Sequence, residues 1–121
     1  MKPNVLITGG AGFIGAHLVR EILKYDHLTP VVLDDLSGGF EDHIPEGCFF
    51  IKGSINDTNL VKQIFETYNF KYVYHLAAYA AEGLSHFIRK FNYENNLIGS
   101  INLINESIKH KVDCFVFTSS I

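Results

Sequence analysis

The sequence has few cysteines, no concentration of basic residues and no apolar segment of membrane-spanning length. Its two cysteines, Cys48 and Cys114, each lie within an apolar run, which favours reduced core thiols over a disulfide framework or a metal site. A formal net charge of −3 offers no basic surface to a nucleic acid. Residues 1–10 run into a strand pattern without the features of a signal peptide. We therefore expect a cytoplasmic protein with no metal, no nucleic-acid partner and no membrane partner.

The composition is typical of a packed domain. Hydrophobic residues make up 47% of the 121 positions and charged residues 19%. A globular chain of this length buries roughly two-thirds of the surface that its unfolded form exposes. We expect residues 1–121 to form one domain around one core.

Five short runs rich in β-branched and aromatic residues alternate with helical patterns. Nearly continuous apolar runs are typical of strands that are buried on both faces of a parallel sheet. The alternation predicts a doubly wound α/β sheet of the Rossmann type with right-handed crossovers. The expected strands cover residues 5–8, 31–34, 48–52, 72–76 and 114–118.

Three apolar stripes at helical spacing lie between these strands. Asp57 can cap the second helix, and the positive charge of residues 109–111 suits the end of the third. Residues 35–47 carry glycine and proline but no stripe, which predicts a loop or short turns. The stripes consist of Ile14, Leu18, Val19, Ile22 and Leu23; of Leu60, Val61, Ile64, Phe65 and Tyr68; and of Phe87, Phe91, Ile98, Ile101, Ile104 and Ile108.

The fifth strand is expected at the edge of the sheet. In the Rossmann order a sixth strand flanks the fifth, and the helix after the fifth covers part of one face. Because the sequence stops at Ile121, we expect an exposed edge, an apolar patch beside it and marginal stability of the isolated chain.

A glycine-rich turn follows the first expected strand and opens the first helix. Residues 8–15 read Thr-Gly-Gly-Ala-Gly-Phe-Ile-Gly, which satisfies G-x-G-x-x-G. Its glycines permit a tight turn and close approach of the backbone to a pyrophosphate, to which the helix N-terminus offers free N–H groups. Such turns also occur for backbone reasons alone. Asp34 ends the second strand, where it can accept hydrogen bonds from an adenosine ribose, so the order of features favours a dinucleotide site.

The segment around Asp34 indicates which dinucleotide binds. Residues 25–51 contain no Lys or Arg but several acids. A 2′-phosphate would therefore meet repulsion and no cationic partner, so NAD is favoured over NADP. No Gly-Lys-Ser/Thr follows the glycine turn, which excludes a P-loop.

These residues resemble the extended short-chain dehydrogenase/reductase family, and within it the NAD-dependent epimerase/dehydratase branch close to UDP-glucose 4-epimerases. The resemblance runs through the whole chain and includes residues 34–37, 53–57, 75–78, 95–99 and 115–120. It implies that the chain is the N-terminal portion of such an enzyme. The NAD-binding residues that it implies are Gly9, Gly12, Phe13, Ile14, Gly15, Asp34, Ser54, Ile55, Leu76, Ala77, Ala78 and Asn96, and the catalytic hydroxyl that it implies is that of Ser120.

Other interpretations stay open for the secondary positions. Asn96 can bond to neighbouring backbone, His75 can be a satisfied core histidine, and Ser120 can simply end a strand. The sequence also departs from the family pattern. Ser54 stands where Asp is common, and Ala80 stands where some epimerases carry Lys.

The resemblance implies a nucleotide-sugar 4-epimerase that oxidises its substrate transiently with bound NAD. No Tyr of this chain has a Lys four residues later, so the family's Tyr-x-x-x-Lys is absent and we expect the chain to be inactive alone. Alternatives are a nucleotide-sugar dehydratase or reductase, and a non-catalytic dinucleotide-binding module. A homodimer stays open.

Overall fold

The computed structural model describes residues 3–9, 13–25, 27–36, 42, 44–76 and 89–117, and of residues 13 and 89–97 it describes only the backbone. All five expected strands and the three expected helices are present, with strand ends shifted by at most two residues. The elements are β1 (Asn4–Thr8), α1 (Phe13–Leu23), β2 (Thr29–Asp34), β3 (Phe49–Lys52), α2 (Thr58–Thr67), β4 (Phe70–His75), α4 (Arg89–Lys109) and β5 (Cys114–Phe117).

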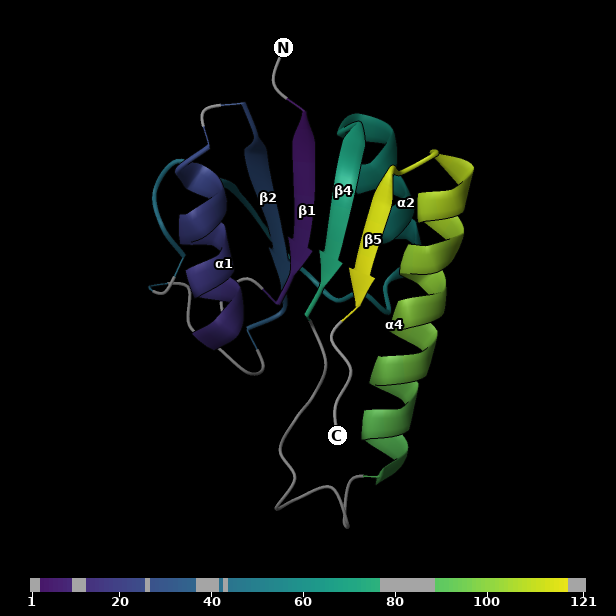
Figure 1. Cartoon of the computed structure of the whole chain (residues 1–121). Coiled ribbons are helices and arrows are strands. Elements are labelled where there is room, and N and C mark those ends of the chain that lie inside the picture. Colours follow the sequence, from purple (N-terminus) through teal and green to yellow (C-terminus); the bar gives the residue numbers. More distant parts are fainter. Residues whose placement is uncertain are drawn as a thin grey trace.

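The five strands form one parallel sheet in the order β3-β2-β1-β4-β5. The strand arrows point the same way in Figure 1, so their carboxyl ends lie together at the lower edge of that view. Helix α1 packs on one face of the sheet, whereas α2 and α4 pack on the other. The predicted Rossmann-type fold is confirmed.

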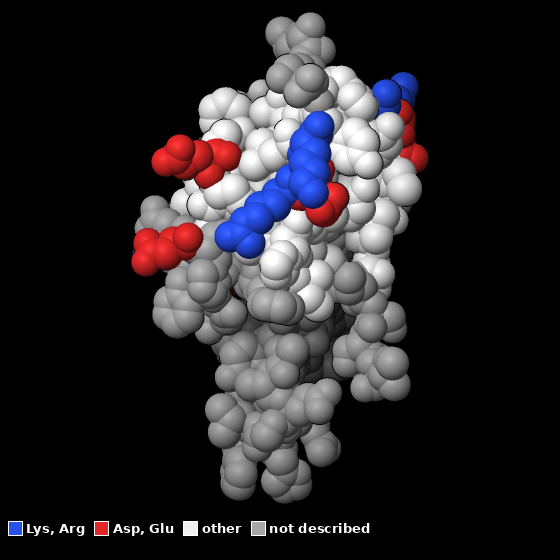
Figure 2. Space-filling view, turned by 60° about the vertical axis from the view of Figure 1, so that its left-hand side comes forward, with Lys and Arg blue, Asp and Glu red and all other residues white. Residues whose placement is uncertain are grey.

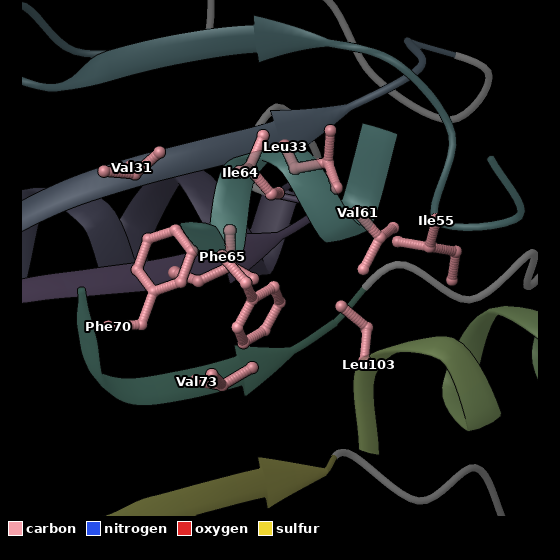
Figure 3. Packing of buried hydrophobic residues seen from close by; sticks show 10 residues of the cluster. Val31, Leu33, Ile55, Val61, Ile64, Phe65, Phe70, Val73 and Leu103 are labelled. Carbon is pink, nitrogen blue, oxygen red and sulfur yellow. The ribbon is translucent and has the colours of Figure 1, made fainter. Parts of the chain in front are cut away.

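The larger core cluster lies between the sheet and α2. Helix α2 turns Val61, Ile64 and Phe65 toward the β2 and β4 side chains (Figure 3). The Phe65 ring meets Phe70 edge-on, with 5.1 Å between centroids. Burial of a side chain of this size contributes about 1.5–3 kcal/mol. Asp57 caps the helix by accepting the Leu60 N–H at 3.1 Å, as predicted.

The predicted stripe of α1 matches its buried face except at Ile14, whereas the predicted stripe of α4 does not. On α1 the predicted Val19 and Ile22 are buried and Leu18 and Leu23 pack half-buried against the core, whereas Ile14 is 68% exposed and Ala16 is buried in addition. On α4 the predicted isoleucines Ile98, Ile101, Ile104 and Ile108 are exposed, and the helix buries the neighbouring row that contains Gly99, Leu103 and Ser107. Close packing explains the choice on α4, because a Cβ on Gly99 would overlap the Ile55 side chain.

The outer strands are less buried than their apolar sequences predicted. Strand β5 lies at one end of the sheet, with Val116 and Phe117 exposed. Cys114 is also exposed, so the expectation of two core thiols is wrong for it, because no described element covers that face of β5. The exposed edge and apolar patch match the expectation for the fifth strand.

Candidate dinucleotide-binding site

The carboxyl ends of the central strands are tied together by backbone hydrogen bonds. Gly9 donates its N–H to the Leu33 carbonyl at 2.9 Å, and Leu76 donates to the Thr8 carbonyl at 3.1 Å. Gly53 donates to the Asp34 carbonyl at 3.1 Å. The residues that follow β1, β3 and β4 therefore meet the end of β2 at one edge. Ligands of open α/β sheets bind at this edge, where the strand order reverses between β1 and β4.

The glycine turn begins at this edge. Gly9 has a φ of 77°, which glycine adopts far more readily than other residues. Helix α1 begins at Phe13, and Gly15 is buried in its first turn. The N-terminal end of α1 thus lies just beyond the end of β1. This arrangement presents helix N–H groups at the edge where a pyrophosphate is expected.

The Asp34 carboxylate is buried and accepts a hydrogen bond from the backbone that follows β2. The residue is only 7% exposed, and its Oδ1 accepts the Leu36 N–H at 2.7 Å. Leu36 has a positive φ of 66°. A carboxylate offers about four acceptor sites, so it can accept from Leu36 and from a ribose hydroxyl at once. Its chemistry fits the ribose of an adenosine.

The loop after β3 is fixed by its own side chains and by α4. Ser54 Oγ accepts the Asn56 N–H at 3.1 Å. Ile55 points into the core, and its carbonyl accepts a hydrogen bond from the Asn102 side-chain amide at 2.9 Å. Ser54 therefore shapes a turn here, and contact of this loop with adenine stays a prediction.

His75 is a satisfied core histidine, one of the interpretations that the sequence left open. Its Nδ1 lies 2.8 Å from Thr8 Oγ1, and its Nε2 lies 2.8 Å from Ser100 Oγ. Burial lowers the pKa of His75 to about 4. The neutral ring can donate through one nitrogen and accept through the other. Sequence reasoning missed Thr8 and Ser100 as its partners, and only the position of Ser100 one helical turn after Asn96 could have pointed to it.

For several predicted site residues the structure describes no side chain or no atoms. Gly12, Ala77, Ala78 and Ser120 lie outside the described residues. Phe13 and Asn96 have described backbone in α1 and α4, but nothing is described of their side chains. Their roles stay predictions. Of the remaining predicted residues, Gly9 and Asp34 meet at the carboxyl edge, and Leu76 follows β4 there.

A groove between α4 and β5 lies at the other end of the strands. It is lined by Ile104, Ser107, Ile108, Lys111, Val112 and Phe115. Because Lys111 and Val112 precede β5, this groove is separate from the glycine turn.

Charge is mixed on the side of the molecule that comes forward in Figure 2. The basic side chains drawn there are few and lie beside acidic ones. Lys24, which follows α1, pairs with Glu21 at 2.9 Å. Among the helices that the structure describes, none combines the length and the apolar character that a membrane crossing needs.

The parallel sheet, the glycine turn after β1 and the buried acid at the end of β2 define a dinucleotide-binding domain of the Rossmann type. The chain belongs to the NAD dependent epimerase/dehydratase family, which matches residues 5–121. The family expected from the sequence is thereby confirmed.

Known relatives of the chain include UDP-glucose 4-epimerases. That of Dictyostelium discoideum is 35% identical over 99% of this chain and 38% of its own length. That of Halalkalibacterium halodurans is 36% identical over 96% of this chain and 34% of its own length. The chain therefore spans little more than a third of these relatives.

Solved structures agree. The Thermotoga maritima UDP-glucose 4-epimerase with UDP-glucose is 37% identical, with a TM-score of 0.93 over 97% of this chain and 38% of that chain. The Thermus thermophilus UDP-glucose 4-epimerase in complex with NAD is 35% identical, with a TM-score of 0.91 over 97% of this chain and 37% of that chain.

Proposed function

We propose that residues 1–121 are the NAD-binding domain of a nucleotide-sugar 4-epimerase. The observation that carries the proposal is the buried Asp34 carboxylate at the end of β2, beside the Gly9 turn. Family membership supports NAD as the cofactor. The 4-epimerase reaction is chosen because the similar curated proteins and solved structures include several UDP-glucose 4-epimerases.

Three regions of the chain would contact different parts of the cofactor. The glycine turn, with Gly9, Gly12, Phe13, Ile14 and Gly15, would hold the pyrophosphate through backbone N–H groups. Asp34 would accept hydrogen bonds from the adenosine ribose, and Ser54 and Ile55 would lie beside adenine. Leu76, Ala77 and Ala78 would lie along the nicotinamide side, and Asn96 is a further proposed cofactor contact.

The same residues explain a preference for NAD over NADP. A 2′-phosphate would approach the Asp34 carboxylate, and residues 25–51 contain no Lys or Arg to neutralise it. Two negative groups in a partly buried site repel each other strongly. The chain should therefore bind NAD more tightly than NADP.

This chain would supply some of the groups that the proposed reaction needs, but it has no Tyr-x-x-x-Lys. Bound NAD would accept a hydride from a sugar carbon and return it. The Ser120 hydroxyl would hold the reacting sugar oxygen by a hydrogen bond. No Tyr-x-x-x-Lys is present to take the hydroxyl proton. We therefore expect this chain alone to bind NAD without turning over a nucleotide sugar, which would be the substrate of a complete enzyme.

Substitution of Asp34 tests the cofactor assignment. Asp34→Asn keeps the shape of the side chain but removes its charge, so the dissociation constant for NAD should rise about tenfold while that for NADP stays or falls. Both constants are measured by calorimetric titration of the folded chain. Asp42→Asn is the control, because Asp42 is an exposed acid in the same β2–β3 connection. An unchanged preference in Asp34→Asn would contradict the role of Asp34.

A further inference from the structure

The chain turns through a left-handed backbone conformation directly after β2. Among the residues that the structure describes, two residues other than glycine have a positive φ, Leu36 at 66° and Lys111 at 55°. Residues with a Cβ seldom adopt this conformation, because the Cβ crowds the following carbonyl oxygen. Where it occurs, the surrounding structure must hold it in place.

Lys111 has an ordinary explanation at the end of α4. The Val112 N–H bonds to the Ser107 carbonyl at 2.9 Å, and the Lys111 N–H bonds to the Ile108 carbonyl at 3.2 Å. This pair of bonds is the Schellman motif, in which the residue after a helix takes the left-handed conformation. The positive φ of Lys111 therefore belongs to helix capping.

Leu36 follows a strand and not a helix, and its N–H bonds to a side chain. It follows β2, and its N–H donates to Asp34 Oδ1 at 2.7 Å, a length typical of a bond to a charged acceptor. The Asp34 backbone is fixed as well, since its carbonyl accepts the Gly53 N–H. The left-handed turn thus brings one N–H back onto the carboxylate at the proposed ribose site.

We propose that Leu36 is a positioning residue that sets the preference of the site for NAD over NADP. The inference rests on the proposed function, because it concerns the same carboxylate. The Leu36 N–H holds the Asp34 carboxylate in one orientation, in which it accepts the ribose 2′-hydroxyl and opposes a 2′-phosphate. A carboxylate released from this bond can rotate away, which weakens the contact with NAD and relieves the repulsion of NADP.

Removal of the Leu36 N–H tests the inference. Leu36→Pro has no N–H and cannot adopt a φ near 66°. The ratio of the NADP dissociation constant to the NAD dissociation constant should fall about tenfold. A purely structural role would weaken both cofactors equally and leave the ratio unchanged. That outcome would overturn the inference.

Two matched variants separate the N–H from the Leu side chain and from backbone strain. Leu36→Asn keeps the N–H, and Asn tolerates the left-handed conformation, so it should retain the wild-type ratio. Lys111→Gly removes the other positive-φ side chain, far from the site, and should leave both dissociation constants unchanged. Loss of the preference in Leu36→Asn would assign it to the side chain and overturn the inference.

A double-mutant cycle shows whether Leu36 acts through Asp34. In an Asp34→Asn background, Leu36→Pro should change the ratio no further. If circular dichroism shows that Leu36→Pro is unfolded, a backbone ester at position 36 removes only the N–H and replaces it in the test. A folded wild-type chain without preference for NAD would overturn the proposed function as well. Wild-type preference that persists in Leu36→Pro or the ester would overturn the inference alone.

Discussion

His75 joins three parts of the chain through its two ring nitrogens. It bonds to Thr8 at the end of β1 and to Ser100 on α4, while it ends β4 itself. The residue is only 2% exposed, so the ring is held without the water that would stabilise its charge. His75 therefore lies where β1 and β4 adjoin, at the edge where the cofactor is proposed to bind.

The lowered pKa of His75 predicts a loss of stability in acid. Its pKa falls from 6.5 to about 4 on folding, so the unfolded chain binds a proton between these values and the folded chain does not. The stabilisation is present above pH 6.5 and is lost progressively as the pH falls toward 4. The free energy of unfolding should drop by as much as about 3 kcal/mol from this group across that window.

Urea unfolding of wild type and His75→Gln at several pH values checks this prediction. Gln can still donate and accept hydrogen bonds but does not titrate in this range, so its stability curve should be flatter between pH 6.5 and 4. Parallel curves for the two proteins would assign the acid sensitivity to other groups.

At the scale of elements, α4 is placed by close contact with the loop after β3. Asn102 on α4 bonds to the Ile55 carbonyl, and Gly99 lies against the Ile55 side chain. Gly99 ends the segment 95–99 that resembles the family, and its lack of a side chain lets the helix approach this loop. The glycine therefore has a packing role that its sequence position did not reveal.

Gly99→Ala should destabilise the fold although alanine favours helix. The intrinsic gain is about 1 kcal/mol, but the added Cβ would overlap the buried Ile55 side chain. Overpacking of this kind costs about 1–3 kcal/mol, and the fixed neighbour places the cost at the upper end, so we expect a net loss of about 1–2 kcal/mol. Thermal unfolding measures it, with exposed Asn105→Ala on the same helix as control. If Gly99→Ala were stabilised like the control, the Ile55 loop would have moved to accommodate the added methyl group, and the prediction would be wrong.

The helices also show how far an apolar pattern can be interpreted. The stripe of α2 correctly predicted Val61, Ile64 and Phe65 as buried because its apolar residues form a single face. Helix α4 has two adjacent rows of residues at helical spacing. The row of isoleucines was predicted to be buried, and that prediction is wrong. The sheet and loop select the row with Gly99 and Leu103 because small residues there allow close approach. That selection depends on tertiary contacts that a single-helix pattern does not contain.

In the whole molecule, the strands and helices that the structure describes and their parallel sheet were predictable from the sequence. Alternating strands and helices allow few other arrangements once crossovers are right-handed. The glycine turn and Asp34 were also predictable, because their positions follow from the ends of β1 and β2. The bonds from His75 and Leu36 were not, since each depends on where a neighbouring backbone or side chain lies.

The exposed apolar surface is the other property of the whole molecule. Val116 and Phe117 on β5 and the isoleucines of α4, with Ile108 72% exposed, leave apolar area in contact with water. Exposed apolar patches favour aggregation when no partner covers them. A cofactor that binds only the folded chain would stabilise it by about 2.7 kcal/mol at a concentration of 100 times its dissociation constant.

We expect the carboxyl edge of this sheet to bind NAD in preference to NADP. Calorimetric titration of the purified, folded chain with each cofactor tests it most directly. We predict saturable binding of NAD with one cofactor per chain, and clearly weaker binding of NADP. Absence of NAD binding, or equal affinity for the two cofactors, in a chain shown to be folded would contradict it.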